Sequence, residues 1–328
     1  MISTYALTYP SPHNSQPIRL RIVDDVTAEL YYDKACGLPA ESYGAPFGFV
    51  CVGVFLEICS IAAHDLGYEL TFDLNLLEDM DFKTLDLHKL GPLKLHKVHN
   101  KIPDFPVRLL LRRQTSRLPY KKQLVPVEVL NVVREEARSF GHTWHDSSDQ
   151  TIVDDIIAVN QKTLFYDLEN KNVRNEISHW LRYSKKEAQS KADGLSAETM
   201  HVNGLLLKTF IGLHFLWRLP LLGSLAKNAY LNTMRGVRQV GWITGPFSNN
   251  QEYFTAGRLF IRTWLHFVQA GVAIHPFGSV ITNPRSHQEF CAIVDENEKD
   301  GMAWMLMRIG FSKTPPKSFR RGKDDLLI

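Results

Sequence analysis

PSPHNSQP, residues 10–17, is followed directly by the alternating segment IRLRIV, residues 18–23. Proline fixes its own φ angle and restricts the residue before it, so the first segment cannot form a helix. Its short polar side chains are of the kind that hydrogen-bond to nearby backbone in turns. The alternation that follows is typical of a half-buried strand. The sequence therefore predicts a rigid polar loop that leads into a strand.

The rest of the first hundred residues combines strands with one apolar helix. A helix is expected from about Pro46 to Asp65, because the segment is apolar almost throughout and Gly67 follows as a stop signal. Two later segments alternate as strands do, YELTFDL (68–74) and LKLHKVH (93–99). This combination predicts one α+β half of the chain.

From residue 101 onward, helical patterns predominate. Residues 193–250 are rich in glycine, proline, asparagine and aromatic residues, which predicts an insertion or lid. The segment VAIHPFGSVI (272–281) is expected to be a strand broken by its proline and glycine. Apolar residues recur at helical spacing in three further segments. The helices expected there are 126–141, 170–184 and 255–271, the last with Thr255 as its N-cap.

The composition argues against several classes of protein. A formal charge of +3 over 328 residues is too small for binding nucleic acid over a broad surface. Four scattered cysteines without a CxxC pair, and no signal-peptide pattern, predict a cytoplasmic protein. The apolar stretches 45–63 and 205–223 both contain charged residues, so we expect no integral membrane segment. The first is predicted to be a buried helix, and the second an amphipathic helix or lid.

Familiar nucleotide, hydrolase and zinc-protease motifs are missing from the sequence, namely GxGxxG, the P-loop, GxSxG and HExxH. His142 and His145, with Asp146 beside them, have the residue types of metal ligands, but further ligands are not evident. Glu176 and His179 match the ExxH of di-iron bundles, which needs a second copy that the chain lacks. We therefore expect no metal site, and no catalytic side chain is identified.

Two basic clusters are the most informative polar features. LRRQTSRLPY (111–120) sets arginines around two hydroxyls, and KTPPKSFRRGK (313–323) brings further cations. A phosphate monoester needs positive partners and several donors, and guanidinium groups bind its oxygens bidentately. Each cluster alone is compatible with a solvated surface or a weak nucleic-acid patch. Together, at the two ends of one half, they predict a single phosphate pocket.

These clusters resemble motifs of the nitroreductase-like flavoprotein superfamily, which binds FMN. RRQTSR resembles the family's Arg-x-Ser/Thr-x-Lys/Arg motif, which implies that Arg113, Thr115 and Arg117 hold the FMN phosphate. FRRGKDDLLI resembles the basic C-terminal motif that closes the same phosphate site, which implies Arg320 and Arg321. The resemblance therefore assigns the two clusters to one cofactor.

Two more segments resemble the parts of that family that lie against the flavin ring. GVAIHPFGS resembles the segment whose backbone runs beside the ring, and PSPHNSQP resembles PSxxNxQPW, with Ile18 where the family has tryptophan. The implied ring-side residues are Pro276, Phe277 and Gly278 from the first segment, and Pro10, Ser11, His13, Asn14 and Gln16 from the second.

The order of the motifs is unusual for that family. In ordinary members the ring loop follows the arginine motif and reaches the partner subunit's flavin, whereas here it comes first by about a hundred residues. That order resembles the single-chain, two-lobed (Acg-like) group, in which one polypeptide mimics the dimer. The resemblance implies an α+β, nitroreductase-like fold with lobes at 1–100 and 101–328, the second carrying the phosphate site and a lid at about 193–250. It also implies a monomer acting as a pseudo-dimer, with further oligomerisation left open.

The implied function is that of an FMN-dependent oxidoreductase. A hydride would pass through flavin N5 to or from a small organic substrate, with NAD(P)H as a candidate electron donor that this family binds without a Rossmann motif. Because the chain has one arginine motif, one flavin per chain is expected. Two alternatives stay open: a protein that stores or sequesters FMN with little turnover, and an interaction or membrane-surface protein built around residues 205–223.

Overall fold

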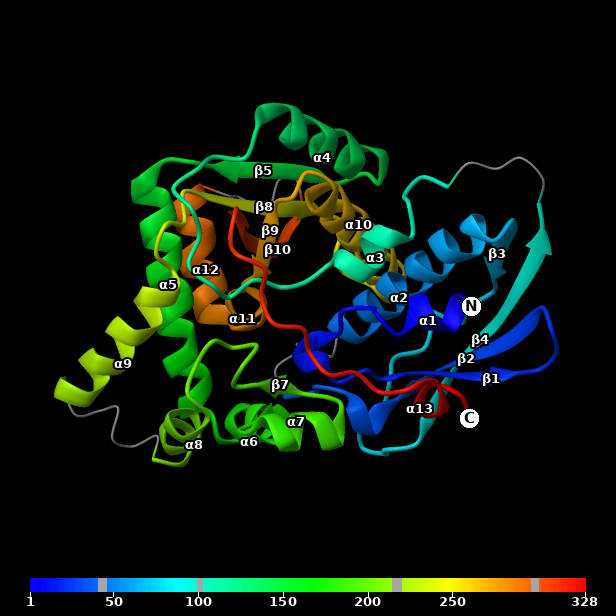
Figure 1. Cartoon of the computed structure of the whole chain (residues 1–328), viewed down its shortest axis with the longest axis horizontal. Coiled ribbons are helices and arrows are strands. Elements are labelled where there is room, and N and C mark those ends of the chain that lie inside the picture. Colours follow the sequence, from blue (N-terminus) through cyan, green and yellow to red (C-terminus); the bar gives the residue numbers. More distant parts are fainter. Residues whose placement is uncertain (41–45, 99–102, 214–219, 296–300) are drawn as a thin grey trace.

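The computed structural model describes residues 1–40, 46–98, 103–213, 220–295 and 301–328 and forms two lobes, each built around a four-stranded sheet (Figure 1). The first sheet has the order β1-β2-β4-β3 and the second the order β5-β8-β10-β9, and all neighbouring strands are antiparallel. The first contains β1 (Ile18–Ile22), β2 (Thr27–Asp33), β3 (Tyr68–Phe72) and β4 (Leu87–Lys97). The second contains β5 (Thr143–Ser147), β8 (Gln239–Gly245), β9 (Ala273–Pro276) and β10 (Met302–Gly310).

The two lobes repeat one topology. In each, two strands of the sheet precede a long central helix and two more follow it. The helix is α2 (Pro46–Asp65) in the first lobe and α10 (Asn250–Gln269) in the second, and each has 20 residues. Matching β1, β2, β3 and β4 with β5, β8, β9 and β10 gives the same strand order in both sheets. The chain therefore has an α+β fold made of two matching halves.

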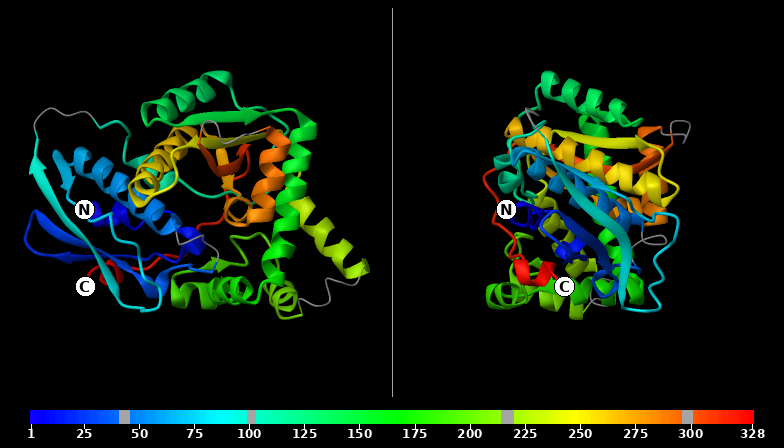
Figure 2. Two further views of the ribbon diagram at one scale, coloured as in Figure 1. Left: turned by 180° about the vertical axis from the view of Figure 1, so that it is seen from behind. Right: turned by 90° about the vertical axis from the view of Figure 1, so that its right-hand side faces the viewer.

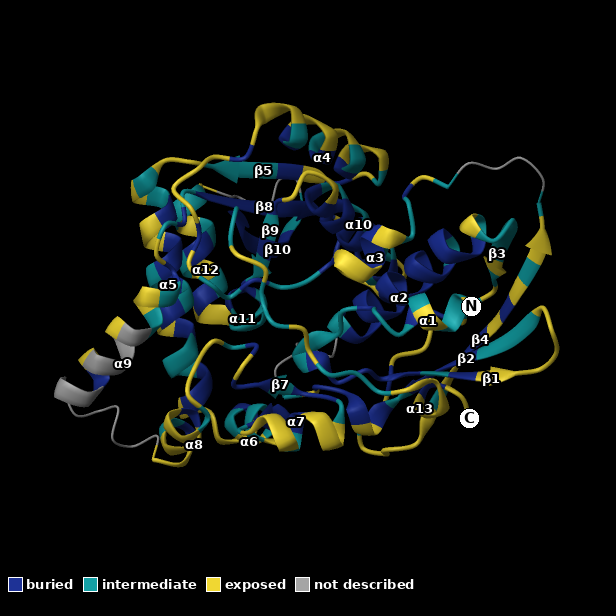
Figure 3. Cartoon of the chain, viewed as in Figure 1, coloured by how far each residue is buried: buried dark blue, intermediate teal, exposed yellow. Residues whose placement is uncertain are grey.

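The central helices α2 and α10 pack on each other in the middle of the molecule, where both are largely buried (Figure 3). A Cβ on Gly53 would lie 2.0 Å from the carbonyl oxygen of Phe254, and a Cβ on Gly257 would lie 2.0 Å from that of Val50. The contacts are reciprocal, so the helices cross at a point of local two-fold-like symmetry. Only glycine allows the two backbones to approach this closely.

A buried carboxylate also links α2 and α10 through ion pairs. Glu57 on α2 accepts hydrogen bonds from Arg258 Nε at 2.9 Å and Arg262 Nη1 at 2.8 Å, both on α10. Arg262 also pairs with Asp104 and Glu136. A buried charge is strongly unfavourable without such partners, so these arginines account for the one buried carboxylate of this largely apolar helix.

Helix α2 is the only described helix long and apolar enough to cross a membrane, and 89% of its most apolar window is buried inside the protein. It therefore has the environment of a core helix, in agreement with the sequence prediction.

Further helices cover the second lobe and extend it. Helices α5, α11 and α12 pack on the sheet face away from α10, and α9 lies against α5 (Figure 1). Helices α6 to α8 form a layer with the short parallel strands β6 (Leu181–Arg182) and β7 (Leu195–Ser196). The helices are α4 (Val127–Ser139), α5 (Gln150–Glu169), α6 (Lys171–Trp180), α7 (Lys185–Lys191), α8 (Gly204–Gly212), α9 (Pro220–Thr233), α11 (Gly278–Thr282) and α12 (Pro284–Val294).

The two ends of the chain lie on the first lobe. The C-terminal segment, coloured red, leaves the second lobe and reaches the first sheet (Figure 2). There, Ile328 N donates to Leu20 O at 2.9 Å. The remaining short helices are α1 (Ile2–Ala6), η1 (Pro12–Asn14), η2 (Lys34–Cys36), α3 (Arg108–Arg112) and α13 (Lys323–Leu326).

Three expectations from the sequence differ from the structure. Helix α10 begins at Asn250 and not at Thr255, because the Asn249 side chain caps it by accepting from Glu252 N. The segment 272–281 is a strand only as far as Pro276, and α11 follows it. Part of the stretch 193–250 is no insertion, since β8 is a fully buried central strand of the second sheet. The expected lobe boundary near residue 100 falls outside the described residues and stays a prediction.

Candidate functional site

The opening loop has a backbone that most residues avoid. His13, Asn14 and Gln16 have φ angles of 49°, 56° and 53°, in the left-handed region. Asparagine tolerates this conformation, whereas histidine and glutamine are strained in it. Ser11 Oγ accepts from Gln16 N at 2.9 Å and fixes the turn, beside the half-buried Pro10. The rigid polar loop expected from the sequence is therefore present, and its contacts with surrounding residues stabilise the strained backbone.

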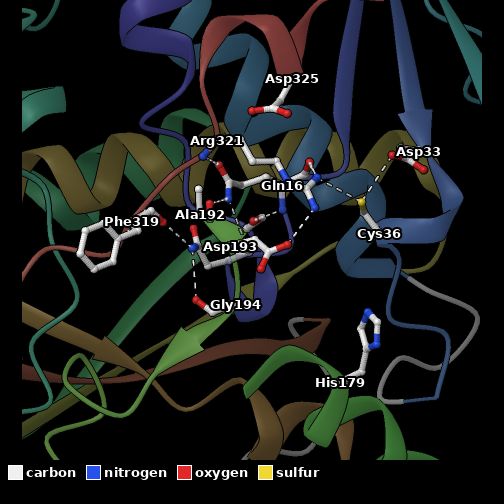
Figure 4. Close-up of polar contacts among 12 residues, drawn as sticks. Gln16, Asp33, Cys36, His179, Ala192, Asp193, Gly194, Phe319, Arg321 and Asp325 are labelled. Carbon is white, nitrogen blue, oxygen red and sulfur yellow. Dashed lines mark hydrogen bonds and ion pairs between the residues drawn. The ribbon is translucent and has the colours of Figure 1, made fainter. Parts of the chain in front are cut away.

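Two buried amides of this loop bind segments that are distant in the sequence (Figure 4). Asn14 Nδ2 donates to Gly194 O at 3.2 Å and to Phe319 O at 3.0 Å. Gln16 Nε2 donates to Ala192 O at 2.9 Å, and its Oε1 accepts from Arg321 N at 3.1 Å. The loop thus connects the 192–194 turn with the C-terminal segment. The Oδ1 atom of Asn14 is buried and has no hydrogen-bond partner.

At this junction the Arg321 side chain forms an ion pair with an acidic residue. Its Nη2 lies 2.9 Å from Asp193 Oδ2, and its Nη1 donates to Cys36 Sγ at 3.3 Å (Figure 4). Arg182 pairs with the other oxygen of Asp193 at 2.5 Å. The sequence predicted Arg321 as a phosphate ligand, but its charge in this structure is balanced by a carboxylate.

Arg113 and Arg320 form a cationic pair without an acidic partner. The Arg113 guanidinium lies 4.4 Å above the Trp264 ring on α10, and its Nη2 donates to Thr8 O at 2.9 Å. Arg320 Nη1 donates to Tyr9 O at 2.7 Å. Among the described residues neither forms an ion pair, and Arg113 Nε is buried without a partner. Two neighbouring guanidiniums that lack a carboxylate form a site suited to an anion.

The pKa values of this pair reflect the unbalanced charge. Burial, and then the charge of Arg320, lower the pKa of Arg113 well below its usual range. Burial also lowers the pKa of Arg320 to about 10. Both shifts have the sign expected when charged groups lose water and gain no counter-ion. An anion placed between the two groups would reverse them.

Arg117, the second arginine of the RxTxR motif, belongs to a different group. Its pKa is lowered to about 10 by burial and then by Arg308, not by Arg113 or Arg320. Arg308 lies on the sheet face away from α10, over the Tyr120 ring at 4.4 Å. The structure therefore divides the arginines of the motif between two cationic centres, where the sequence predicted one.

The segment between these arginines runs along the edge of the second sheet. Thr115 forms a parallel β-bridge with Ile274, and Ser116 N donates to Ile274 O at 3.0 Å. Beyond β9, Phe277 is 2% exposed and its N–H donates to Leu306 O, so this residue packs in the core of the lobe. Gly278 begins α11, and a Cβ there would meet no atom within 4 Å. Backbone pairing thus places the RxTxR segment beside the strand that ends at Pro276.

Sequence reasoning missed three residues of these centres. Arg308 lies in MAWMLMRIG, an otherwise apolar strand, and a charge in such a strand is a signal that could have identified it. Trp264 and Tyr9 have no comparable signal, because each is one aromatic residue in an apolar pattern. Their role depends on tertiary contacts.

Other polar candidates lie elsewhere. Cavities of about 500 and 270 Å³ flank Arg262, and neither is lined by a residue expected at the flavin. His142 accepts from Trp304 Nε1, His145 hydrogen-bonds to Thr244, and Asp146 pairs with Arg134. Within the described ranges, no group of three or more His, Cys, Asp or Glu side chains is placed to hold a metal ion.

Stability should depend on pH through a partly buried histidine of β9. Burial, and then the charges of Arg308 and Arg117, hold the pKa of His275 well below its usual value of 6.5. The unfolded chain takes up a proton near pH 6.5 that the folded chain does not, so the free energy of unfolding should fall as pH decreases below about 6.5. Denaturant titrations between about pH 5 and pH 7 should show this slope. His275→Gln should reduce the slope but not abolish it, because burial also lowers the pKa of His142. An unchanged slope in that variant would contradict the assignment.

No protein-family model and no curated protein matches the chain. Solved structures do resemble its fold. A nitroreductase with bound FMN from Bacteroides fragilis has 9% identity and a TM-score of 0.35, over 66% of this chain and 92% of that one. An FMN-dependent nitroreductase from Mycobacterium smegmatis in complex with NADPH has 14% identity and a TM-score of 0.36, over 66% and 94%. A nitroreductase-like protein from Bacillus cereus has 10% identity and a TM-score of 0.35, over 70% and 96%. At these values the likeness concerns the fold and assigns no role to any residue.

Proposed function

We propose that the chain binds FMN and works as an oxidoreductase on a small organic substrate. The observation that carries this proposal is the pair of guanidiniums at Arg113 and Arg320, which no carboxylate of the described residues balances. A terminal phosphate monoester carries the charge and the acceptor oxygens that such a pair lacks. The nitroreductases of this fold that bind or depend on FMN lend general support.

The residues present fit a phosphate group by their chemistry. Arg113 keeps a buried Nε–H without an acceptor, and the indole of Trp264 holds its guanidinium in a fixed plane. Arg320 is anchored through the carbonyl oxygens of Leu7 and Tyr9, so its position is set before any ligand binds. Preorganised donors of this kind bind an anion with little loss of side-chain entropy.

Each part of the site would have a distinct task. Arg113 and Arg320 would bind the phosphate, with Thr115 as an additional hydroxyl donor. The strained loop at Ser11, His13 and Asn14 would contact the ring side, where the free Oδ1 of Asn14 can accept a hydrogen bond. FMN, when bound, supplies hydride chemistry, and the protein supplies binding, orientation and exclusion of water. NAD(P)H is the proposed electron donor.

No disulfide joins any of the four cysteines, all of which lie in the described residues, and this supports a reducing compartment such as the cytoplasm. Burial raises the pKa of Cys51 and Cys59 far above the usual thiol range, so both are poorly reactive. The proposal therefore assigns no chemistry to either thiol and relies on the cofactor alone.

Turnover is tested with the purified full-length chain after incubation with FMN. Oxidation of NADH or NADPH should be followed in the presence of a quinone, a nitroaromatic compound or oxygen. Flavin-dependent turnover with at least one acceptor is the expected result. Binding of FMN without turnover under any of these conditions would favour a storage protein, and absence of FMN binding would refute the proposal as a whole.

A further inference from the structure

A second cationic centre lies in the second lobe, on the sheet face away from α10. Arg308, in the middle of β10, is fully buried. Its Nη1 donates to Thr233 O at 2.8 Å, and its Nη2 donates to Ser116 O at 3.1 Å and Leu118 O at 3.3 Å. These carbonyl groups satisfy hydrogen-bond donors but carry no net charge. The Nε atom of Arg308 is buried and has no partner.

Arg117 adds a second guanidinium to this centre. Burial, and then the charge of Arg308, lower its pKa to about 10. No hydrogen bond or ion pair joins its side chain to another residue in the described part of the chain. Two partly or fully buried cations with no carboxylate beside them in the described residues destabilise the folded state. This cost is relieved if an anion from solution joins them.

His275 faces the same centre. It stands directly opposite Arg308 in the pairing of β9 with β10, and directly opposite residues project from the same face of a sheet. Its Nδ1 atom is buried without a hydrogen-bond partner. Burial, and then the charges of Arg308 and Arg117, hold its pKa well below 6.5, so the ring is neutral at pH 7 and can donate one N–H.

Two tyrosines provide the aromatic surroundings of the centre. The Arg308 guanidinium lies over the Tyr120 ring at 4.4 Å, and the Tyr120 hydroxyl donates to Ser116 O. Burial raises the pKa of Tyr230 on α9, and the charges of Arg308 and Arg117 oppose that shift. The Tyr230 oxygen accepts from Asn160 on α5. Both hydroxyls therefore already have partners, and neither is a carboxylate that could balance the arginines.

We propose that Arg117, Arg308 and His275 form a binding site for the carboxylate group of a small organic acid. The unused donors match two oxygens: Arg117 offers its bidentate fork, and Arg308 Nε and His275 Nδ1 offer one N–H each. A phosphate group has three oxygens that accept hydrogen bonds, whereas Arg308 has only its Nε–H left to donate. The aromatic rings of Tyr120 and Tyr230 suit the carbon part of such an acid.

This site is distinct from the proposed flavin site and does not depend on it. Arg113 lies against Trp264 of α10, whereas Arg308 belongs to the core on the opposite face of the sheet. Variants at the two centres should therefore separate the two activities, and failure of one proposal leaves the other intact.

The first test measures thermal unfolding of the full-length chain against sodium acetate, with sodium chloride keeping the ionic strength constant. Acetate should raise the midpoint in a saturable way, as expected for a ligand that binds the folded state. Arg117→Gln should abolish the shift, and Arg113→Met should retain it. An equal shift with chloride, an equal shift with inorganic phosphate in the Arg113→Met variant, or an acetate effect that survives Arg117→Gln would overturn the proposal.

The second test needs no variant. Phenylglyoxal modifies free guanidinium groups, and peptide mass spectrometry of the digested protein reports the rate at each arginine. Saturating acetate should slow modification of Arg117 and leave the exposed Arg112 unchanged. Equal protection of both arginines, or protection of neither, would contradict a carboxylate site at Arg117.

Discussion

Arg113→Met is expected to weaken FMN binding by roughly 10- to 150-fold while leaving the folded chain at least as stable as the wild type. Losing a hydrogen-bond partner of a charged group costs about 1.5–3 kcal/mol, which corresponds to that range of affinity. The free energy of unfolding should not decrease, because the Arg113 guanidinium is buried beside Arg320 without a counter-ion and the substitution removes this unfavourable charge. Methionine fills the space over Trp264 without that charge.

The matched control for this prediction is Arg112→Met. Arg112 is the neighbouring residue, at the exposed end of α3, and it forms no ion pair with any other described residue. Flavin fluorescence titrations and denaturant unfolding of both variants provide the comparison. If Arg112→Met and Arg113→Met bind FMN equally well, or if Arg113→Met unfolds more easily, the anion site is wrongly placed.

Gly257→Ala is expected to destabilise the chain by roughly 3 kcal/mol or more, at the upper end of the range for overpacking. The added Cβ would lie 2.0 Å from Val50 O and 2.9 Å from Val50 C, which are backbone atoms that cannot rotate away. The helices α2 and α10 would have to separate, and the buried pairs of Glu57 with Arg258 and Arg262 lie at the same contact.

Gly212→Ala is the control for the helix crossing. This glycine is also helical, at the end of α8, but a Cβ there would meet no atom within 4 Å. Replacing a helical glycine by alanine gains about 0.5–1 kcal/mol when space is available. Denaturant unfolding should therefore move in opposite directions for the two variants. A Gly257→Ala protein as stable as the wild type would show that the helices do not cross at this point.

Local signals in the sequence predicted many of the elements. The polar loop at 11–17, the helix at 46–65 and the helices near 127–139 and 171–180 follow from proline, glycine and apolar spacing, which act over a few residues. The predicted start of α10 was wrong. Asn249 and Thr255 are both good helix caps, and the tertiary burial of Asn250 and Phe254 decides between them.

The matching of the two lobes could not be recognised from residue identity. Apolar positions of each half are filled by different residues, and in the second half only, helices α5 to α9 and the short strands β6 and β7 separate β5 from β8. One feature of the sequence does reflect the matching of the two lobes. Gly53 and Gly67 have the same spacing as Gly257 and Gly271, and these pairs mark the helix crossing and the turn into the next strand.

The candidate site was only partly accessible from the sequence. Arg113 and Arg320 are more than 200 residues apart, and motif resemblance was needed to associate them. The same resemblance placed Arg117 and Arg321 in one pocket with them, but Asp193 pairs with Arg321 and Arg308 accompanies Arg117. Both of these partners come from parts of the chain whose positions depend on the complete fold.

The most direct test of the account compares FMN with riboflavin, which differs only in lacking the phosphate. The full-length chain is titrated with each flavin, and the binding constant and stoichiometry are determined from fluorescence quenching. FMN should bind with one molecule per chain and far more tightly than riboflavin, and Arg113→Met should remove most of the difference. Equal affinity for FMN and riboflavin in the wild-type protein would contradict the central claim that Arg113 and Arg320 bind the phosphate.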